Sequence, residues 1–302
     1  MNGDLETGVL KGVSRSFYLT LRLLPAPMRR GASLGYLLAR TSDTIADTTG
    51  VSVAERLELL AAYGAAVEGQ GKLPIWPKDL LVTAEPKEMI LLERGEEVLA
   101  GLRDLPEAEK RVVREVVEII ISGQRLDLER FAGASGEHPV ALASDAELED
   151  YTWRVAGCVG AFWTKLGFLT LGESYSTASE EELLRRGIAY GKGLQLVNIL
   201  RDLPRDLASG RCYLPVDPLG TKAELLSSHA RWLKQAQSWI AQGEIYADTL
   251  PLRRLRAATV LPAWLAEETL AKLEGASWET LEQRVKVPRR QVYRLLWDAW
   301  WR

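Results

Sequence analysis

The chain has 302 residues, 47% of them hydrophobic, and its formal net charge at pH 7 is −3. A weakly acidic chain is not expected to bind nucleic acid, because such binding depends on neutralising phosphates with Lys and Arg. The length and apolar content allow one large core, so we expect a single domain over residues 1–302.

Apolar residues recur at helical spacing along most of the chain, and strand signals are nearly absent. The expected fold is therefore all-α, with Asp145 and Ser179 as N-caps. Two stretches, 69–86 and 133–144, are expected to be loops. The expected helices cover 5–17, 25–48, 53–69, 87–103, 107–131, 145–171, 180–203, 222–243, 250–270 and 277–301.

The N-terminal residues show no basic stretch followed by an apolar run, so no signal peptide is expected. We find no run of about 18 apolar residues and expect no membrane-spanning helix. The two cysteines, Cys158 and Cys212, make neither a disulfide framework nor a zinc site. A reducing, cytoplasmic location is expected.

One row of polar residues crosses an otherwise apolar helical segment. Gln195, Asn198, Asp202 and Asp206 follow at steps of three, four and four, which places them on one helix face. Burying such groups is costly unless they bind something, and the last three carry the oxygen ligands that Mg2+ prefers. The row predicts a Mg2+ site, although Pro204 should either kink the helix or end it near residue 203.

A second row near the N-terminus has the same character. Tyr36, Arg40, Asp43 and Asp47 are spaced to share one helix face. Two acid pairs facing each other across a cavity could hold Mg2+ together with substrate phosphates. Arg40 and Arg201 would bind the same phosphates. The alternative is that both rows are ordinary solvated helix faces, on which acid pairs are common.

Taken together, these residues resemble the squalene and phytoene synthases, which join two isoprenyl diphosphates head to head. Segment 122–128 (Ser-Gly-Gln-Arg-Leu-Asp-Leu) also matches the family at the expected place along the chain. Segment 43–47 (Asp-Thr-Ile-Ala-Asp) is closer to the squalene synthase form of the first acidic motif than to the phytoene synthase form. Four ordered blocks carry the resemblance: 14–17 (Ser-Arg-Ser-Phe), 36–47, 151–160 (Tyr-Thr-Trp-Arg-Val-Ala-Gly-Cys-Val-Gly), and 193–206 with 210–215 after it.

The resemblance implies an isoprenoid synthase-type helical bundle around a central cavity. It implies that two farnesyl diphosphates are joined to presqualene diphosphate and then reduced to squalene, with Mg2+ and NADPH. Dehydrosqualene, hydroxysqualene and phytoene are alternative products in the same family. The chain has no Rossmann fingerprint, and Gly191-Lys192-Gly193 is only a fragment of one. In this family NADPH binds on the helical fold itself, and the sequence does not indicate where.

Two departures from the family pattern favour a different class of function. Ala46 stands where squalene synthases often carry a third acid, and Arg205 stands where the second motif often has Glu. They are the only support for a non-catalytic helical protein that binds lipid or assists assembly.

The resemblance also implies roles for individual residues. Tyr151 would relay the proton lost when the cyclopropane ring of presqualene diphosphate closes. Arg40, Asp43 and Asp202 would be the other catalytic residues. Without the family, Tyr151 would be read as a buried tyrosine with a satisfied hydroxyl. The expected metal ligands are Asp43, Asp47, Asn198, Asp202 and Asp206. The expected substrate-binding residues are Ser14, Arg15, Phe17, Tyr36, Arg40, Gln195, Arg201 and Arg211.

A carbocation needs dry, apolar surroundings, and the sequence offers candidates for them. Gly157 and Gly160 could either make room for a prenyl tail or allow close helix packing. The candidate wall residues are Phe17, Leu37, Val155, Cys158, Val159, Phe162, Leu194 and Val197.

The C-terminal segment 288–302 is basic and rich in tryptophan. It could lie at a membrane surface as a peripheral contact. Alternatively, a stripe formed by Val292, Leu295, Leu296 and Ala299 could dock it on the core. The sequence does not indicate an oligomeric state.

Overall fold

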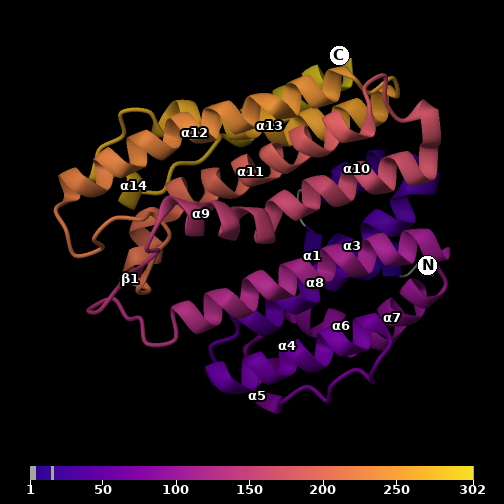
Figure 1. The fold of residues 1–302 in the computed structure, drawn as a ribbon, viewed down its shortest axis with the longest axis horizontal. Coiled ribbons are helices and arrows are strands. Elements are labelled where there is room, and N and C mark those ends of the chain that lie inside the picture. Colours follow the sequence, from indigo (N-terminus) through magenta and orange to yellow (C-terminus); the bar gives the residue numbers. More distant parts are fainter. Residues whose placement is uncertain (1–4, 15–16, 302) are drawn as a thin grey trace. The chain divides into compact units, whose positions relative to one another are not determined.

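The computed structural model describes residues 5–14 and 17–301, and helices dominate it (Figure 1). The expectation of an all-α fold is confirmed. The chain divides into two compact units. Unit 1 is Met1–Glu129 with Lys165–Gly172, and unit 2 is Arg130–Thr164 with Glu173–Arg302. The single domain expected from the sequence stays a prediction.

In unit 1 the long helix α3 (Ala26–Asp47) forms the centre. Its buried side, which includes Leu34, Leu37, Leu38 and Ile45, packs among the neighbouring helices α2, α4, α6 and α7. The other described elements are η1 (Leu5–Leu10, π-helical), α1 (Lys11–Ser14), α2 (Phe17–Leu23), α4 (Val53–Glu68), α5 (Lys78–Thr83), α6 (Pro86–Glu93), α7 (Gly95–Arg103) and α8 (Glu107–Arg130).

Three expectations for unit 1 need correction. The expected loop 69–86 contains α5, a helix too short to show helical periodicity, which is anchored by the fully buried Leu80. The expected helix 87–103 is divided at Arg94, which separates α6 from α7. A Cβ at Gly95, the first residue of α7, would lie 2.8 Å from Leu73. The expected helix 5–17 divides into shorter elements, and residues 15–16 lie outside the described part of the chain.

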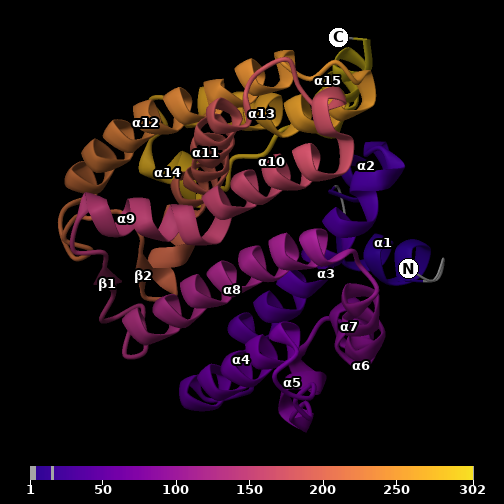
Figure 2. The same ribbon diagram turned by 45° about the vertical axis from the view of Figure 1, so that its right-hand side comes forward.

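Unit 2 is built around α11 (Glu180–Ala208), which packs against α12 and α13 (Figures 1 and 2). The Tyr190 hydroxyl ties α11 to α13 by donating to the Thr259 carbonyl at 2.9 Å. Two further elements, α10 (Cys158–Leu171) and η3 (Gly172–Ser174), are shared between the units, since Lys165–Gly172 belongs to unit 1. The remaining elements of unit 2 are β1 (Val140–Ala141), α9 (Asp145–Thr152), η2 (Trp153–Gly157, π-helical), β2 (Arg211–Cys212), α12 (Lys222–Asp248), α13 (Arg253–Leu273), α14 (Trp278–Glu282) and α15 (Arg289–Trp301).

The largest difference from the sequence analysis in unit 2 concerns Pro204. Of the two alternatives left open for this proline, the end near residue 203, which the expected helix 180–203 followed, is wrong: α11 runs through Pro204 to Ala208. Proline removes one backbone hydrogen bond from a helix. Here Leu203 is buried and Leu207 packs against the same core, so tertiary contacts hold the last turn in place. Asp206 therefore lies on the helix and not in a loop.

Smaller differences affect the ends of elements in unit 2. The N-cap of α9 is Ser144, whose hydroxyl accepts from the Glu147 amide, and not Asp145. The expected Ser179 cap is confirmed by the same kind of bond from Glu182. The expected loop 133–144 contains β1, which pairs in parallel with β2. The expected helix 277–301 is divided into α14 and α15.

The junction between η2 and α10, which holds Gly157 and Gly160, packs directly on α11. A Cβ at Gly160 would lie 1.8 Å from the Gly187 carbonyl oxygen, and one at Gly157 would meet the Lys192 side chain at 3.0 Å. At Gly160 the two backbones touch, because no side chain separates them, and at Gly157 the Ile188 carbonyl oxygen would also lie within 3.3 Å of the added Cβ. Close helix packing therefore accounts for both glycines.

Within the described residues, one helical stretch passes the test for a membrane span. Asp145–Ser174 is long and apolar enough by length and composition alone, because an 18-residue window within it has a mean hydropathy of 1.3. We did not identify this segment from the sequence, and the absence of a membrane-spanning helix stays a prediction. A core helix meets the same criterion, and 33% of the apolar window is buried.

Candidate active site

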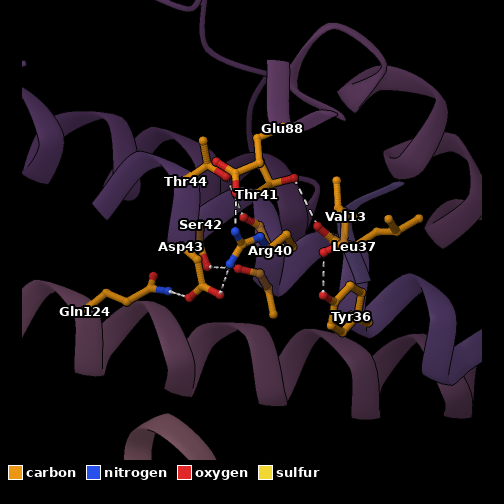
Figure 3. Close-up of polar contacts among 11 residues, drawn as sticks. Val13, Tyr36, Leu37, Arg40, Thr41, Ser42, Asp43, Thr44, Glu88 and Gln124 are labelled. Carbon is orange, nitrogen blue, oxygen red and sulfur yellow. Dashed lines mark hydrogen bonds and ion pairs between the residues drawn. The ribbon is translucent and has the colours of Figure 1, made fainter. Parts of the chain in front are cut away.

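The first acidic row lies on α3, where helical spacing puts the four predicted residues on one face. Figure 3 shows three of them, Tyr36, Arg40 and Asp43. The hydroxyl of Tyr36 donates to the Val13 carbonyl at 3.1 Å, which links α3 to α1. The hydroxyl of Ser14 donates to the Leu10 carbonyl at 2.5 Å and so bonds within its own helical segment. Arg15 and the side chain of Phe17 lie outside the described part of the structure.

Arg40 is held between two carboxylates (Figure 3). One of its Nη atoms forms an ion pair with Glu88 of α6, and the other lies 3.8 Å from Oδ2 of Asp43. Burial would lower the pKa of Arg40, but these two negative charges outweigh it and raise the pKa. The guanidinium is therefore charged, and it is held beside the acidic pair.

The carboxyl of Asp43 has a strongly raised pKa. Burial, followed by the negative charge of Asp47 one turn away, raises the pKa of its carboxyl to about 6. A hydrogen bond from Nε2 of Gln124, 2.7 Å from Oδ1, opposes that rise. The Asp43 side chain still keeps 44% of its surface exposed. A cation can therefore reach the carboxylate.

We call Arg40, Asp43, Asp47, Glu88 and Gln124 the first half-site. Its two α3 carboxylates are close enough to repel each other, and both offer hard oxygen atoms. This donor set fits Mg2+, which binds through one or two carboxylates together with substrate phosphates and water. Among the described residues of either unit, no three His, Cys, Asp or Glu side chains gather as a ready metal site. The remaining ligands would have to come from other groups, such as a diphosphate.

The second acidic row lies on α11 as predicted, because the helix continues through Pro204. Asn198 is exposed, and Gln195, Asp202 and Asp206 are half-buried. With Arg201 and Arg284 these residues form what we call the second half-site. It carries two carboxylates and one amide oxygen at helical spacing, a donor set that also fits Mg2+.

Asp202 is engaged by two arginines. Arg201 donates to both of its oxygens, and Nε of Arg284 donates to Oδ1 at 3.1 Å. Burial by itself would raise the pKa of Asp202, but the hydrogen bonds and charges of the two arginines outweigh it and lower the pKa. Asp202 is therefore ionised at neutral pH.

Tyr151 lies in α9, and its side chain is buried in the core of unit 2. Its ring stacks on that of Tyr213, with centroids 4.6 Å apart and an interplanar angle of 22°. Arg211 lies two residues before Tyr213, in β2, where it pairs with Val140 of β1. The short parallel ladder thus fixes the segment that holds both Arg211 and the stacking partner of Tyr151.

Of the seven predicted apolar wall residues whose side chains the structure describes, four are buried and three are half-buried. Leu37 is buried in unit 1, and Cys158, Phe162 and Val197 are buried in unit 2. Val155, Val159 and Leu194 are half-buried. Whether these side chains line a cavity stays a prediction.

Sequence reasoning missed Glu88, Gln124 and Arg284. Gln124 lies in the segment 122–128 that matched the family, but nothing marked its side chain as a partner of Asp43. Glu88 and Arg284 reach the acidic rows from elements distant in sequence. A sequence pattern could have indicated their helices but not these contacts.

Comparison with known proteins settles the family. The squalene/phytoene synthase profile matches residues 10–291. The chain belongs to the squalene/phytoene synthase family. Both half-sites and Tyr151 fall inside the matched range, so the resemblance expected from the sequence is confirmed.

Several relatives in this family are similar to the chain. It is 27% identical over 301 residues to a presqualene diphosphate synthase of Zymomonas mobilis, covering 94% of this chain and 89% of the relative. It is 31% identical over 214 residues to a phytoene synthase of Thermus thermophilus, covering 70% and 58%. Against a bifunctional lycopene cyclase/phytoene synthase of Phaeosphaeria nodorum, it is 28% identical and spans only 33% of the relative's length.

Solved structures show the same fold. TcSQS in complex with the ligand E5700 has a TM-score of 0.79 at 21% identity, covering 96% of this chain and 84% of that one. The squalene synthase HpnC from Alicyclobacillus acidocaldarius has a TM-score of 0.60 at 19% identity, covering 96% and 94%. At these identities the likeness shows an all-α fold of the squalene synthase type.

Proposed function

We propose that the chain joins two farnesyl diphosphates head to head to form presqualene diphosphate, and then reduces this intermediate to squalene with NADPH. The main support is the pair of acidic rows, each with arginines beside it, in a chain that resembles a presqualene diphosphate synthase over nearly its whole length. Asp43, Asp47, Asn198, Asp202 and Asp206 would hold Mg2+. When bound, Mg2+ stabilises the negative charge that develops on a departing diphosphate.

The reaction begins when the allylic C–O bond of one substrate breaks and the electron pair leaves with the diphosphate. Arg40, Arg201 and Arg211 would neutralise the charge on the diphosphate oxygens, because guanidinium groups bind phosphate in bidentate fashion. Ser14, Tyr36 and Gln195 would donate hydrogen bonds, and Arg15 and Phe17 would complete the substrate contacts. The double bond of the second substrate then attacks the allylic cation.

Closing the cyclopropane ring requires the loss of one proton. Tyr151 would relay this proton towards the released diphosphate, a general acid–base role that a tyrosine hydroxyl can fill. The stack on Tyr213 supports this role by fixing the orientation of the ring. Apolar side chains around the cation would exclude water, which would otherwise quench it.

The relatives also support a second product. The phytoene synthases of Thermus thermophilus and Synechocystis are 31% and 25% identical to the chain. Phytoene would require longer substrates, whereas dehydrosqualene and hydroxysqualene differ from squalene in how the final cation is quenched. Neither phytoene nor dehydrosqualene formation needs the NADPH reduction, so dependence on NADPH separates them from squalene.

The proposal of a non-catalytic role rests on Ala46 and Arg205. Ala46 is buried, so a carboxylate at that position would have to be desolvated. The absence of an acid at residue 46 leaves the half-buried Asp43 and the exposed Asp47 in place. Arg205 is exposed and replaces an acid without removing Asp202 or Asp206. Both acidic pairs survive these departures, which favours catalysis.

Replacing one acid in each half-site tests the catalytic role. Asp43→Asn and Asp202→Asn should each reduce diphosphate release by more than about a hundredfold, since the effect of losing a metal ligand should exceed the 10–100-fold typical of a supporting residue. Helix content by circular dichroism should stay unchanged. Asp104→Asn, at an exposed acid outside both half-sites, should keep wild-type turnover. Unchanged turnover in both half-site variants would contradict the proposal.

We also propose that the chain is cytoplasmic and contacts an anionic membrane surface through α15. Leu295, Leu296 and Ala299 pack on the core, as one of the two sequence alternatives expected. The opposite side exposes a stripe of aromatic residues one helical turn apart: Tyr293 (69% exposed), Trp297 (66%) and Trp301 (60%). Aromatic rings beside arginines suit the interface of an anionic bilayer. The arginines are Arg289, Arg290 and Arg294.

Sedimentation with vesicles tests this contact. The protein should pellet with vesicles rich in phosphatidylserine more than with neutral vesicles, and a Trp297→Gln, Trp301→Gln variant should lose most of that binding. A variant that still pellets like the wild type would contradict the proposal. A lipid-free dimer that the same variant abolishes would show that the stripe binds a second copy of the chain instead.

A further inference from the structure

Gln124 is a buried amide in the middle of α8. Only 9% of its surface is exposed, and its neighbours along the helix, Ile120, Ile121 and Leu128, belong to the buried core. Removing an amide from water costs free energy unless both of its ends find hydrogen-bond partners. The position of this side chain therefore requires an explanation.

One end of the amide is bonded. Nε2 of Gln124 donates to Oδ1 of Asp43 at 2.7 Å, from the helix that faces α3 in unit 1 (Figure 3). The other oxygen of Asp43, Oδ2, lies 3.8 Å from the Arg40 guanidinium. Gln124 and Arg40 thus bind different oxygens of the same carboxylate. Together they fix its rotation.

The other end of the amide is not bonded. Oε1 of Gln124 is buried and has no hydrogen-bond partner among the residues that the structure describes. A buried acceptor that is left unsatisfied destabilises the folded protein. An amide oxygen is also a hard ligand of the kind that divalent cations accept.

The chemistry of the neighbouring residues explains why an amide suits this place. Asp43 and Asp47 already repel each other, and the row lacks a third acid because Ala46 occupies that position. A neutral oxygen adds a ligand to the pair without adding a third negative charge. Its amide group at the same time orients one of the two carboxylates.

We propose that Gln124 serves the first half-site in two ways: its Nε2 orients Asp43, and its Oε1 contacts Mg2+ or a water bound to it. This inference rests on the proposed function, since it requires that Asp43 binds the cation. A purely structural role makes a different prediction. If Gln124 only joined α8 to α3, its loss would change the stability of the metal-free protein but not its response to Mg2+.

Thermal unfolding with Mg2+ and inorganic diphosphate separates the two roles. Gln124→Met keeps the length of the side chain but removes both polar ends. We expect the Mg2+ concentration that gives half of the maximal Tm increase to rise about tenfold or more, as is typical when a supporting residue of a metal ligand is lost. Gln237→Met, at an exposed glutamine of α12, should leave that concentration unchanged. An unchanged Mg2+ midpoint in Gln124→Met would overturn the proposal.

A second variant covers the case in which Gln124→Met does not fold. Gln124→Glu keeps an oxygen at Oε1 but replaces the donor with a charge that repels Asp43. Its metal-free Tm should fall below that of the wild type, and saturating Mg2+ with diphosphate should restore it. A Tm that stays low at saturating Mg2+ would overturn the proposed cation contact. A wild-type protein whose Tm does not respond to Mg2+ and diphosphate would overturn the metal site itself, and this inference with it.

Discussion

Arg284 donates a hydrogen bond from Nε to Oδ1 of Asp202, although 82 residues separate the two in sequence. Arg284 also has a φ of 56°, and it is the only described non-glycine residue with a positive φ. A left-handed backbone is costly for any residue with a Cβ and persists where the surroundings impose it. The loop after α14 thus keeps a strained conformation at the residue that engages the second half-site.

Two substitutions at this position separate the backbone from the side chain. Arg284→Gly and Arg284→Ala both remove the bond to Asp202, but only glycine adopts a positive φ without strain. We expect the glycine variant to be more stable than the alanine variant by about 1 kcal/mol. Urea unfolding measures the difference. An alanine variant as stable as the glycine variant would show that the backbone is not strained there.

Tyr151 should matter for the chemical step more than for binding. In Tyr151→Phe the ring can still stack on Tyr213, but the hydroxyl that relays the proton is lost. The rate of single-turnover product formation should fall by roughly tenfold to a hundredfold. This loss is at or below the lower end of the rate enhancement that general acid–base catalysis usually gives. The Kd for substrate should change little. Tyr293→Phe removes an exposed hydroxyl and should leave both quantities unchanged. Equal rates in Tyr151→Phe and the wild type would remove the proposed role.

The contact between α10 and α11 should tolerate no side chain at Gly160. An added methyl group would overlap the Gly187 carbonyl, so Gly160→Ala should lower the free energy of unfolding by more than about 3 kcal/mol or prevent folding. Gly64→Ala provides the control. Its Cβ would meet only Ile121, at 3.6 Å, and alanine in a helix should stabilise the protein by up to about 1 kcal/mol. Comparable stabilities of the two variants would contradict the close packing.

His229 should make the stability of the protein depend on pH. Burial lowers the pKa of His229, and a hydrogen bond between Nε2 and the Leu200 carbonyl opposes that shift only in part. Below about pH 6.5 the unfolded chain takes up a proton at this residue more readily than the folded protein. The contribution of neutral His229 to the free energy of unfolding is therefore complete above about pH 6.5. It is lost as the pH falls through the lower pKa that His229 has in the folded protein.

Urea unfolding between pH 7.5 and 5 tests this dependence. The His229→Gln variant should lose less stability on acidification than the wild type, by at most about 1.4 kcal/mol per pH unit. His138, the only other histidine, is exposed, so His138→Gln should keep the wild-type dependence. Identical acid dependence in His229→Gln and the wild type would contradict the assignment.

The long helices and both acidic rows could be predicted from the sequence, because each depends on periodicity within one segment. Asp43 and Asp202 lie on the expected helix faces for this reason. The path of α11 through Pro204 could not be predicted, since core packing and not local preference holds its last turn. The contacts of Gln124 and Arg284 are tertiary, and no local pattern encodes them.

Product analysis tests the central claim most directly. The purified protein is incubated with farnesyl diphosphate and Mg2+, with and without NADPH, and the extracted lipids are identified by mass, with Asp43→Asn and Asp202→Asn as inactive controls. We predict presqualene diphosphate without NADPH and squalene with it. A dehydrogenated or hydroxylated product regardless of NADPH would contradict the reductive step. If neither farnesyl nor geranylgeranyl diphosphate releases diphosphate, the catalytic account is wrong.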